Sequence, residues 1–530
     1  MPCESSIHFS KDTLSNLTLV TMVLCTRCQG PVGEKRGRVV HCSILEGGRC
    51  LACKEDIELE QKIQDLQERR RELRTEMNAN HDPFVLKLPP EIASYIFLLS
   101  MEERDTREIP SRGDCLPTPF RLGAVCSGWR QLARSTPALW TMLAFTLPDS
   151  KIMEDLPHLV ADWLERSGGL PLTLQVSLST TYHNPPLDIG HALVIDALNQ
   201  HSRRWCDVQF NLPSDYIGRL CGSSPPEQLR DPSIDEGADN LPLTFRMNAR
   251  PSPTKFKIWG LLLEAVDVAW DNLVHLDLNC TTLDGILQVI RDAPLLEICS
   301  LRFISPPIDD FRIPEIIIRH PYLQTFQLVV LEQTGVFYKL INSLELPSLE
   351  SWSVDFVELE ESMVLGIMTS FLKRSGCKLK SLNMEQDQAP TVEDLERFLQ
   401  AVPCLQRLRL ACPRYDRSLT PVMDNILERI SASPSMQTDH TAGFLSDLQI
   451  LQLSGRELNS WTCIPLIFRL PHRKLLKMDI DMYSVRIGND VLEELVELVD
   501  QGTELVIYDR LKRRNYLWPF REGAIVESRI

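Results

Sequence analysis

Long apolar runs and an excess of positive charge are both missing from this chain of 530 residues. No stretch of about eighteen consecutive apolar residues occurs, so we expect no membrane-spanning helix. The apolar residues 17–24 form a short stretch without a basic segment before it, so we also expect no secretory signal. The formal net charge is −16. Nucleic acids and anionic membranes are bound through basic surfaces, so we expect neither as a partner.

Sequence signatures of catalytic sites are missing as well. The chain has no phosphate-binding loop, no HExxH metal helix, no nucleophile elbow and no dinucleotide-binding glycine fingerprint. Its 11 histidines are dispersed and form no recognisable constellation. We therefore expect that the protein is not an enzyme.

The composition is that of a globular protein, with 43% hydrophobic and 24% charged residues. The length suits about two to four domains. Most of the 16 cysteines stand singly at positions that otherwise take buried aliphatic residues, as Cys299 does. Unpaired cysteines of this kind are typical of a reducing compartment, so we expect a cytoplasmic or nuclear location.

Four cysteines in the first segment, residues 1–54, instead form two Cys-x-x-Cys pairs: Cys25, Cys28, Cys50 and Cys53. Four thiolates suit tetrahedral zinc, and a structural zinc ion would help to fold a segment so poor in large apolar residues. His41 and Cys42 are substitute ligands between the pairs. The 21 residues between the pairs slightly exceed the usual zinc-ribbon spacing. The alternative, two incidental pairs in a flexible tail, stays open; no other cofactor is expected.

Residues 55–82 are predicted to form a charged helix with a narrow apolar seam. The seam positions follow alternating heptad steps and are Leu59, Ile63, Leu66, Arg70, Leu73 and Met77. Acidic and basic residues alternate around them, as on a solvated helix. Only about three heptads are present. Two interpretations stay open, a short coiled coil formed by self-association and a single helix packed beside the next domain.

The segment of residues 83–147 is predicted to begin with a short helix. The Leu-Pro-Pro-Glu sequence of residues 88–91 is typical of a helix start, because proline is tolerated in the first turn and an acid favours the positive helix end. Four residues then share one face of the helix: Ile92, Tyr95, Ile96 and Leu99. Phe97 lies on the far side of the same helix.

A second helix, predicted from about Arg121 to Arg134, places five residues on one strip: Leu122, Val125, Cys126, Trp129 and Ala133. A third short element carries Leu139 and Trp140. Three short helices have too little interior to bury all these groups. We therefore expect another molecule to cover some of them, as in a docking module. The alternative is an ordinary helical hairpin buried within a larger domain.

This segment resembles an F-box, in the variant found in the large F-box sets of fungi. The resemblance is carried by Leu88-Pro89-Pro90-Glu91-Ile92, Ile96-Phe97, Val125-Cys126, Trp129-Arg130, Leu132 and Leu139-Trp140, about a tenth of the chain. F-box proteins are substrate receptors of cullin–RING ubiquitin ligases, and their F-box binds a Skp-type adaptor. The resemblance implies adaptor contacts from Leu88, Pro89, Ile92, Ile96, Phe97, Val125, Cys126, Trp129, Leu139 and Trp140. One departure is the polar insert of residues 101–119, which is longer than usual and predicted to be a solvated loop.

The pattern Leu-x-x-Leu-x-Leu recurs eight times in the remaining chain. Its central residues are Leu276, Cys299, Phe326, Trp352, Leu382, Leu408, Leu451 and Met478, at spacings of 23, 27, 26, 30, 26, 43 and 27 residues. Helical periodicity fills the intervals, and an insertion at residues 431–442 explains the longest one. The units resemble irregular leucine-rich repeats, which stack into a curved solenoid. The last motif begins at Leu475; strands at 172–178, 208–210 and 243–247 begin the array less regularly, and residues 221–240 are predicted to be a disordered loop.

Polar residues between the motif leucines are predicted to face the open side of the strands, where solenoids commonly bind partners. Our candidate substrate-binding residues are Arg302, Asp355, Arg407, Arg409 and Asp479. Arg407 and Arg409 would face an acidic or phosphorylated feature. The alternative is that these residues only solvate the strand face.

These features predict an α/β protein, a short helical F-box followed by a curved leucine-rich-repeat-like solenoid of parallel strands and helices over residues 148–530. The resemblance implies a substrate-recognition subunit that joins a Skp-type adaptor, and through it a cullin, to an unknown substrate protein. The alternative function is a protein-interaction scaffold that never binds the adaptor.

Overall fold

The computed structural model describes residues 5–8, 22–25, 51–81, 83–101, 117–148, 155–178, 187–236, 245–260, 263–306, 317–331, 334–357, 364–386, 390–412, 419–432 and 444–517. The chain divides into two compact units. Unit 1 comprises Met1–Pro89 and Val125–Trp129, and unit 2 comprises Pro90–Ala124 and Arg130–Ile530.

Unit 2 is built on a 15-stranded sheet whose strands follow one another in chain order, so each new strand is added at the same edge. The strands are β3 (Met142–Leu147), β4 (Leu172–Leu178), β5 (Trp205–Leu212), β6 (Asp231–Glu236), β7 (Lys255–Trp259), β8 (His275–Thr282), β9 (Ile298–Ser305), β11 (Thr325–Leu331), β13 (Ser351–Val357), β14 (Ser381–Gln386), β15 (Arg407–Ala411), β16 (Ile450–Gly455), β17 (Lys477–Met482), β18 (Leu505–Asp509) and β19 (Arg514–Asn515). Neighbouring strands are parallel except β18 and β19. The prediction of an α/β protein with a large parallel sheet is confirmed.

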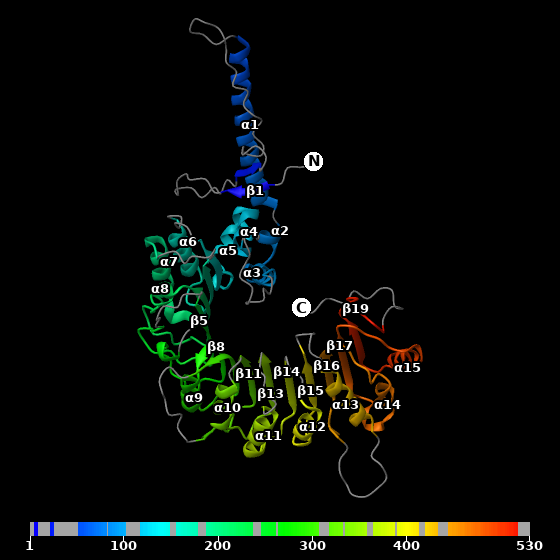
Figure 1. Ribbon diagram of the computed structural model, residues 1–530. Coiled ribbons are helices and arrows are strands. Elements are labelled where there is room, and N and C mark those ends of the chain that lie inside the picture. Colours follow the sequence, from blue (N-terminus) through cyan, green and yellow to red (C-terminus); the bar gives the residue numbers. More distant parts are fainter. Residues whose placement is uncertain are drawn as a thin grey trace, which may run out of the picture. The chain divides into compact units, whose positions relative to one another are not determined.

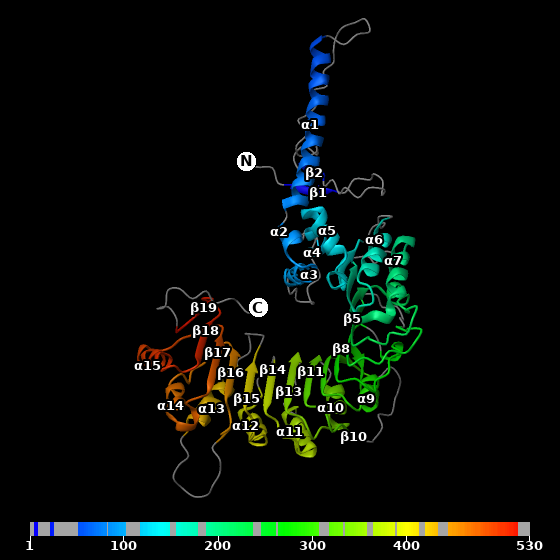
Figure 2. The ribbon, with the colours of Figure 1, turned by 180° about the vertical axis from the view of Figure 1, so that it is seen from behind.

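Helices return the chain between strands and cover the outer face of the curved sheet in unit 2 (Figures 1 and 2). They are α6 (Leu156–Arg166), α7 (Ile189–Gln200), α8 (Ser214–Ile217), α9 (Leu283–Asp292), α10 (Thr334–Asn342), α11 (Val364–Ser375), α12 (Val392–Gln400), α13 (Thr420–Ser431), α14 (Cys463–Arg469) and α15 (Asn489–Asp500). The short pair β10 (Ile318–Arg319) and β12 (Leu344–Glu345) forms a second, parallel sheet. The Thr391 hydroxyl caps α12 by accepting a hydrogen bond of 3.1 Å from the Asp394 amide.

The core of unit 2 consists of the motif residues. The strand register aligns Leu276, Cys299, Phe326 and Trp352 in one row, and all four are buried. Trp352 meets Phe371 of α11 edge to face, with ring centroids 5.1 Å apart. Complete burial raises the pKa of the Cys299 thiol far above its ordinary value. A strand alternates its side chains, so the residues between the motif leucines point to the opposite, open face.

Three expectations for the sheet are wrong. Residues 221–236, which we expect to be disordered, contain β6, because β5 and β7 pair with it on both sides and bury Ile234; residues 237–240 lie outside the described part. Of the strand expected at 243–247, the described residues 245–247 show only an isolated bridge from Phe245 to Val266. In the last motif Leu475 is 90% exposed and Leu476 is buried, because a 3-10 turn at Pro471–Arg473 shifts the phase by one residue.

The first helices also differ from expectation. The start of α3 (Pro90–Leu99) agrees with the Pro-Pro-Glu signal. The single helix expected from Arg121 to Arg134 is two, α4 (Thr118–Val125) and α5 (Ser127–Arg134), because Cys126 leaves the helix and its sulfur accepts a hydrogen bond from the Trp129 amide. The 3-10 helix η1 (Pro137–Trp140) leads into β3, so the sheet begins before residue 148.

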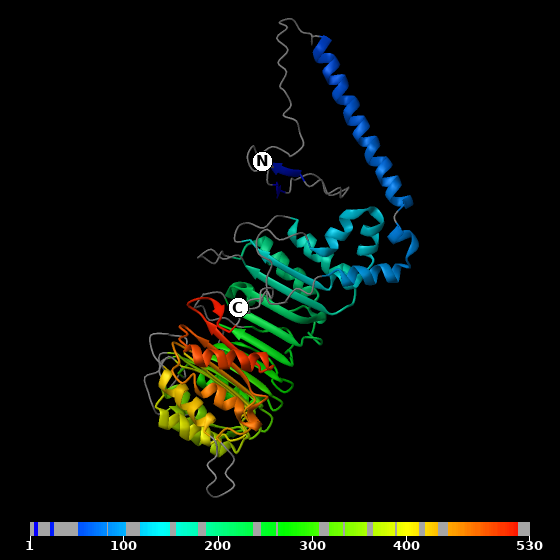
Figure 3. The ribbon, with the colours of Figure 1, turned by 90° about the vertical axis from the view of Figure 1, so that its right-hand side faces the viewer.

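Unit 1 contains the antiparallel pair β1 (Ser5–His8) and β2 (Met22–Cys25), the long helix α1 (Leu51–His81) and the short helix α2 (Pro83–Lys87). Figure 3 shows α1 as one uninterrupted helix. Within the described ranges, no helix combines the length and the apolar character needed to cross a membrane.

Candidate docking surfaces

The face of α3 that carries four large apolar residues points to solvent. Ile92, Tyr95, Ile96 and Leu99 are 49%, 59%, 39% and 67% exposed. Their spacing of i, i+3, i+4 and i+7 makes them one continuous stripe along the helix. Ala93 and Phe97, which occupy the other side of α3, are buried. We call the four exposed residues the α3 stripe.

The α3 stripe rests on a rigid support within unit 2. Ser94 shares a hydrogen bond of 2.9 Å with Thr136, which ties α3 to the residue before η1. Trp140 of η1 donates a hydrogen bond of 2.8 Å from its indole nitrogen to the Ala133 carbonyl. The rings of Trp140 and Trp163 pack edge to face with centroids 4.8 Å apart. A stripe on such a support is preorganised for binding.

Three of the predicted contact residues are not available to a partner. Phe97, Leu139 and Trp140 are 1%, 0% and 2% exposed. Helical spacing shows which residues share a face, and we expected Phe97 to be left over; it is instead the inward anchor of α3. These three residues are therefore removed from the predicted adaptor contacts. Tyr95 and Leu99, which the prediction omits, are added because they are exposed.

The remaining predicted contact residues belong to unit 1. Val125 and Pro89 are exposed, while Leu88 and Cys126 are half-buried. Trp129 is also half-buried, because the ring of Phe84 packs against its indole with centroids 4.9 Å apart. Val85 lies beside Gly128, where an added Cβ would come within 3.3 Å of it. Trp129 therefore serves first to hold the α2 segment to the start of α5.

The open face of the sheet carries an arginine pair on β15. Arg407 and Arg409 are both exposed, and among the described residues neither guanidinium makes an ion pair. Alternate residues of one strand lie about 7 Å apart on the same face, so both groups present donors to the same side. In the register Arg409 stands between Asn383 and Gln452, two uncharged side chains. Burial raises the pKa of Asp481 on β17 and the charge of Arg409 counteracts this rise, so the positive charge of the pair is partly offset on this face.

Of the other predicted substrate-binding residues, Asp479 stands two strands from Arg409 in the same register row, with Gln452 between them, whereas Arg302 lies on β9 and Asp355 on β13. Arg302 stacks over Trp259, with its guanidinium carbon 5.6 Å from the ring centroid. Trp259 lies on β7, a strand that the repeat pattern does not predict, and the register pairs it with Asn279 of β8. Asp479 accepts a hydrogen bond of 3.4 Å from Gln452, and Asp355 is half-buried.

Two of the four proposed zinc ligands fall outside the described residues. Cys25 ends β2 and Cys53 lies at the start of α1, whereas Cys28 and Cys50 are not among the described residues, nor are the substitutes His41 and Cys42. In the described part of the chain, no three His, Cys, Asp or Glu residues gather as a metal site. The zinc site stays a prediction.

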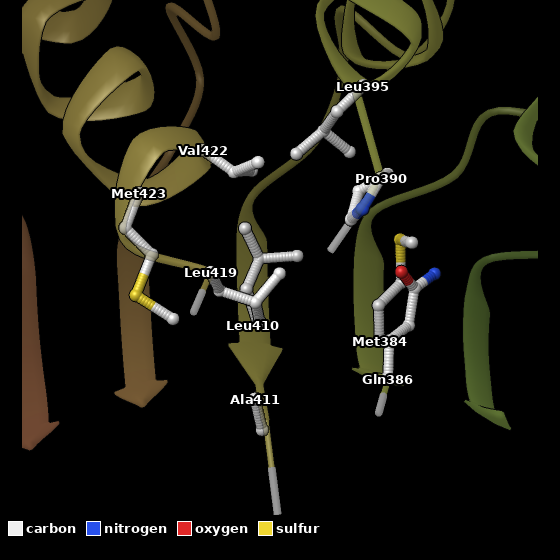
Figure 4. A pocket seen from close by; sticks show the side chains of 9 residues that line it. All are labelled: Met384, Gln386, Pro390, Leu395, Leu410, Ala411, Leu419, Val422 and Met423. Carbon is white, nitrogen blue, oxygen red and sulfur yellow. The ribbon is translucent and has the colours of Figure 1, made fainter. Parts of the chain in front are cut away.

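A small cavity lies between β14, β15, α12 and α13 (Figure 4). Its volume is about 10 Å³, and its lining is mainly apolar, with side chains such as Leu395, Leu410 and Val422. A cavity of this size holds at most about one water molecule. It is a packing defect of the repeat core and offers no room for a ligand.

Comparisons with known proteins give no assignment. No protein-family model matches this chain, and no curated protein matches its sequence.

Proposed function

We propose that this protein is an F-box protein with irregular leucine-rich repeats that serves as the substrate-recognition subunit of a cullin–RING ubiquitin ligase. The α3 stripe would dock on a Skp-type adaptor, and the open face of the repeats would hold a substrate protein. The protein itself performs no chemistry; it raises the effective concentration of the substrate near the ubiquitin-loaded enzyme.

The single observation that carries the proposal is the α3 stripe, which follows directly on the Leu-Pro-Pro-Glu sequence of the F-box resemblance. Four large apolar side chains on ten helical residues remain 39% to 67% exposed. Covering them would contribute roughly 3 to 6 kcal/mol, because a fully buried large apolar side chain contributes about 1.5 to 3 kcal/mol. A contiguous exposed patch of this kind marks an interaction site.

The repeat geometry supports the second half of the proposal. Strands β8 to β17 carry the eight motifs, each followed by a return segment on the outer face, which is the arrangement expected of leucine-rich repeats. The open face then lies ready for a protein partner. The exposed Arg407 and Arg409 favour an acidic or phosphorylated segment of the substrate, since guanidinium groups bind carboxylates and phosphates in bidentate fashion.

The proposal is tested by mixing the purified full chain with a purified Skp-type adaptor and measuring the mass of the mixture by size-exclusion chromatography with light scattering. We expect a stable one-to-one complex, which Ile96→Asp abolishes. The matched control is Leu475→Asp, the same kind of change at an exposed leucine of the repeats. Failure of the folded wild-type chain to bind the adaptor would reject the proposal and favour the adaptor-independent scaffold.

A further inference from the structure

The helix α1 presents an apolar seam that nothing in the described part of the chain covers. All residues from 55 to 77 are exposed, including Leu59, Ile63, Leu66, Leu73 and Met77. With 31 residues, α1 is about 46 Å long at 1.5 Å per residue. Helices in proteins owe most of their stability to packing of an apolar face. We therefore expect another helix to cover the seam.

We propose that this helix is α1 of a second copy of this chain, and that the two helices pair antiparallel as a two-stranded coiled coil. Leucine stands at the three heptad d positions, 59, 66 and 73, and Ile63 and Met77 stand at a positions. Arg70 stands at the remaining a position, and a single polar a residue specifies the register and the oligomer state of a coiled coil. The charged residues that flank the seam decide the orientation.

A parallel pair brings like charges together. In a parallel coiled coil each g residue faces the e residue five positions later on the other helix. Glu55 would then face Glu60, and Arg69 would face Arg74. Lys62 would face the uncharged Gln67. The two charged contacts are repulsive and none is attractive, so the parallel arrangement is disfavoured.

An antiparallel pair brings opposite charges together. In the register with its centre at residue 68, every seam residue opposes a seam residue of the second helix. Leu59 faces Met77, Ile63 faces Leu73, and Leu66 faces Arg70. In this register the flanking g residues face g residues and the e residues face e residues of the second helix.

Four attractive contacts result from two pairs, each formed twice by symmetry. Lys62 faces Glu76 of the second copy, and Glu60 faces its Arg74. Two Arg69 side chains meet near the centre, but each is already paired with Glu72 of its own helix at 2.7 Å. Charge complementarity therefore selects the antiparallel dimer. The dimer forms through α1 alone and does not require the adaptor.

Sedimentation equilibrium of the full chain tests the stoichiometry. We expect a particle of about twice the 60.5 kDa of one chain, reduced to the monomer by Leu66→Asp. Glu68→Lys, a charge change on the outer face of the same helix, is the matched control and should leave the dimer intact. A monomer at all concentrations, or an assembly larger than two chains, would overturn the proposal.

Charge reversals test the orientation. Glu60→Lys should weaken the antiparallel dimer roughly tenfold, since two attractive pairs become repulsive. In a parallel dimer the same change would strengthen association by placing lysine against Glu55. Lys62→Glu should also weaken the dimer, and Glu76→Lys added to it should restore the association. Strengthening by Glu60→Lys, or no rescue by the double change, would overturn the antiparallel arrangement.

Discussion

Substitution of single α3 stripe residues by alanine should weaken adaptor binding, and the loss of affinity should be larger for the more exposed side chains. Full burial of an isoleucine or leucine side chain contributes about 1.5 to 3 kcal/mol. Ile96 is 39% exposed, so Ile96→Ala should remove about 1 kcal/mol, or roughly fivefold in Kd. Leu99 is 67% exposed, so Leu99→Ala should weaken binding by about 1 to 2 kcal/mol, roughly fivefold to thirtyfold in Kd. Ile96→Asp should raise the Kd more than a hundredfold, because it places an unpaired charge in an apolar contact.

The assay is calorimetric titration of each purified full-length variant with the adaptor, together with its thermal unfolding midpoint. Exposed positions tolerate substitution within about 0.5 kcal/mol, so the Tm values should stay close to that of the wild type. Phe97→Ala provides the contrast, because loss of this buried ring should destabilise the fold by about 3 to 5 kcal/mol. Unchanged affinity of Ile96→Asp and Leu99→Ala in folded proteins would refute the assignment of the stripe.

Three further outcomes are expected. Arg407→Glu combined with Arg409→Glu should lower the recovery of acidic or phosphorylated substrate proteins at least tenfold in quantitative affinity purification, with adaptor recovery and Tm unchanged; equal substrate recovery would contradict the proposed anion contact. Trp352→Ala should lower the free energy of unfolding by about 3 to 5 kcal/mol and the Tm by roughly 10 °C, because this fully buried ring packs on α11. An unaltered calorimetric transition would show that the aligned row of motif residues does not form a core. Metal analysis of the full chain should find about one zinc ion per chain, lost when Cys25 and Cys50 are both changed to Ser; retention of zinc in that variant would discard this ligand set.

The regular part of the sheet could be predicted because its motif residues obey a strict alternation. A strand such as β13 places Trp352 and Val354 in the core and Ser353 on the open face, and that pattern is visible in the sequence alone. Strand β6 could not be found in this way. It has a single large aliphatic residue, Ile234, and owes its conformation to pairing with β5 and β7.

The docking surface could be predicted only in part, for a related reason. Helical periodicity grouped Ile92 and Ile96 on one face of α3 but gave no information on which face turns inward. The inward face has only Ala93 and Phe97 as its buried residues, yet one large ring is enough to anchor a helix of ten residues. Exposure, which sequence does not supply, separates the buried residue Phe97 from the exposed residue Leu99.

Affinity purification of the full chain from the cells that express it tests the account most directly, with wild type compared against the Ile92→Asp/Ile96→Asp variant. The account predicts that the Skp-type adaptor and a cullin are recovered with the wild-type protein and lost with the variant, while substrate proteins held by the repeats are retained by both. Recovery of adaptor and cullin in equal amounts with both proteins, or with neither, would contradict it.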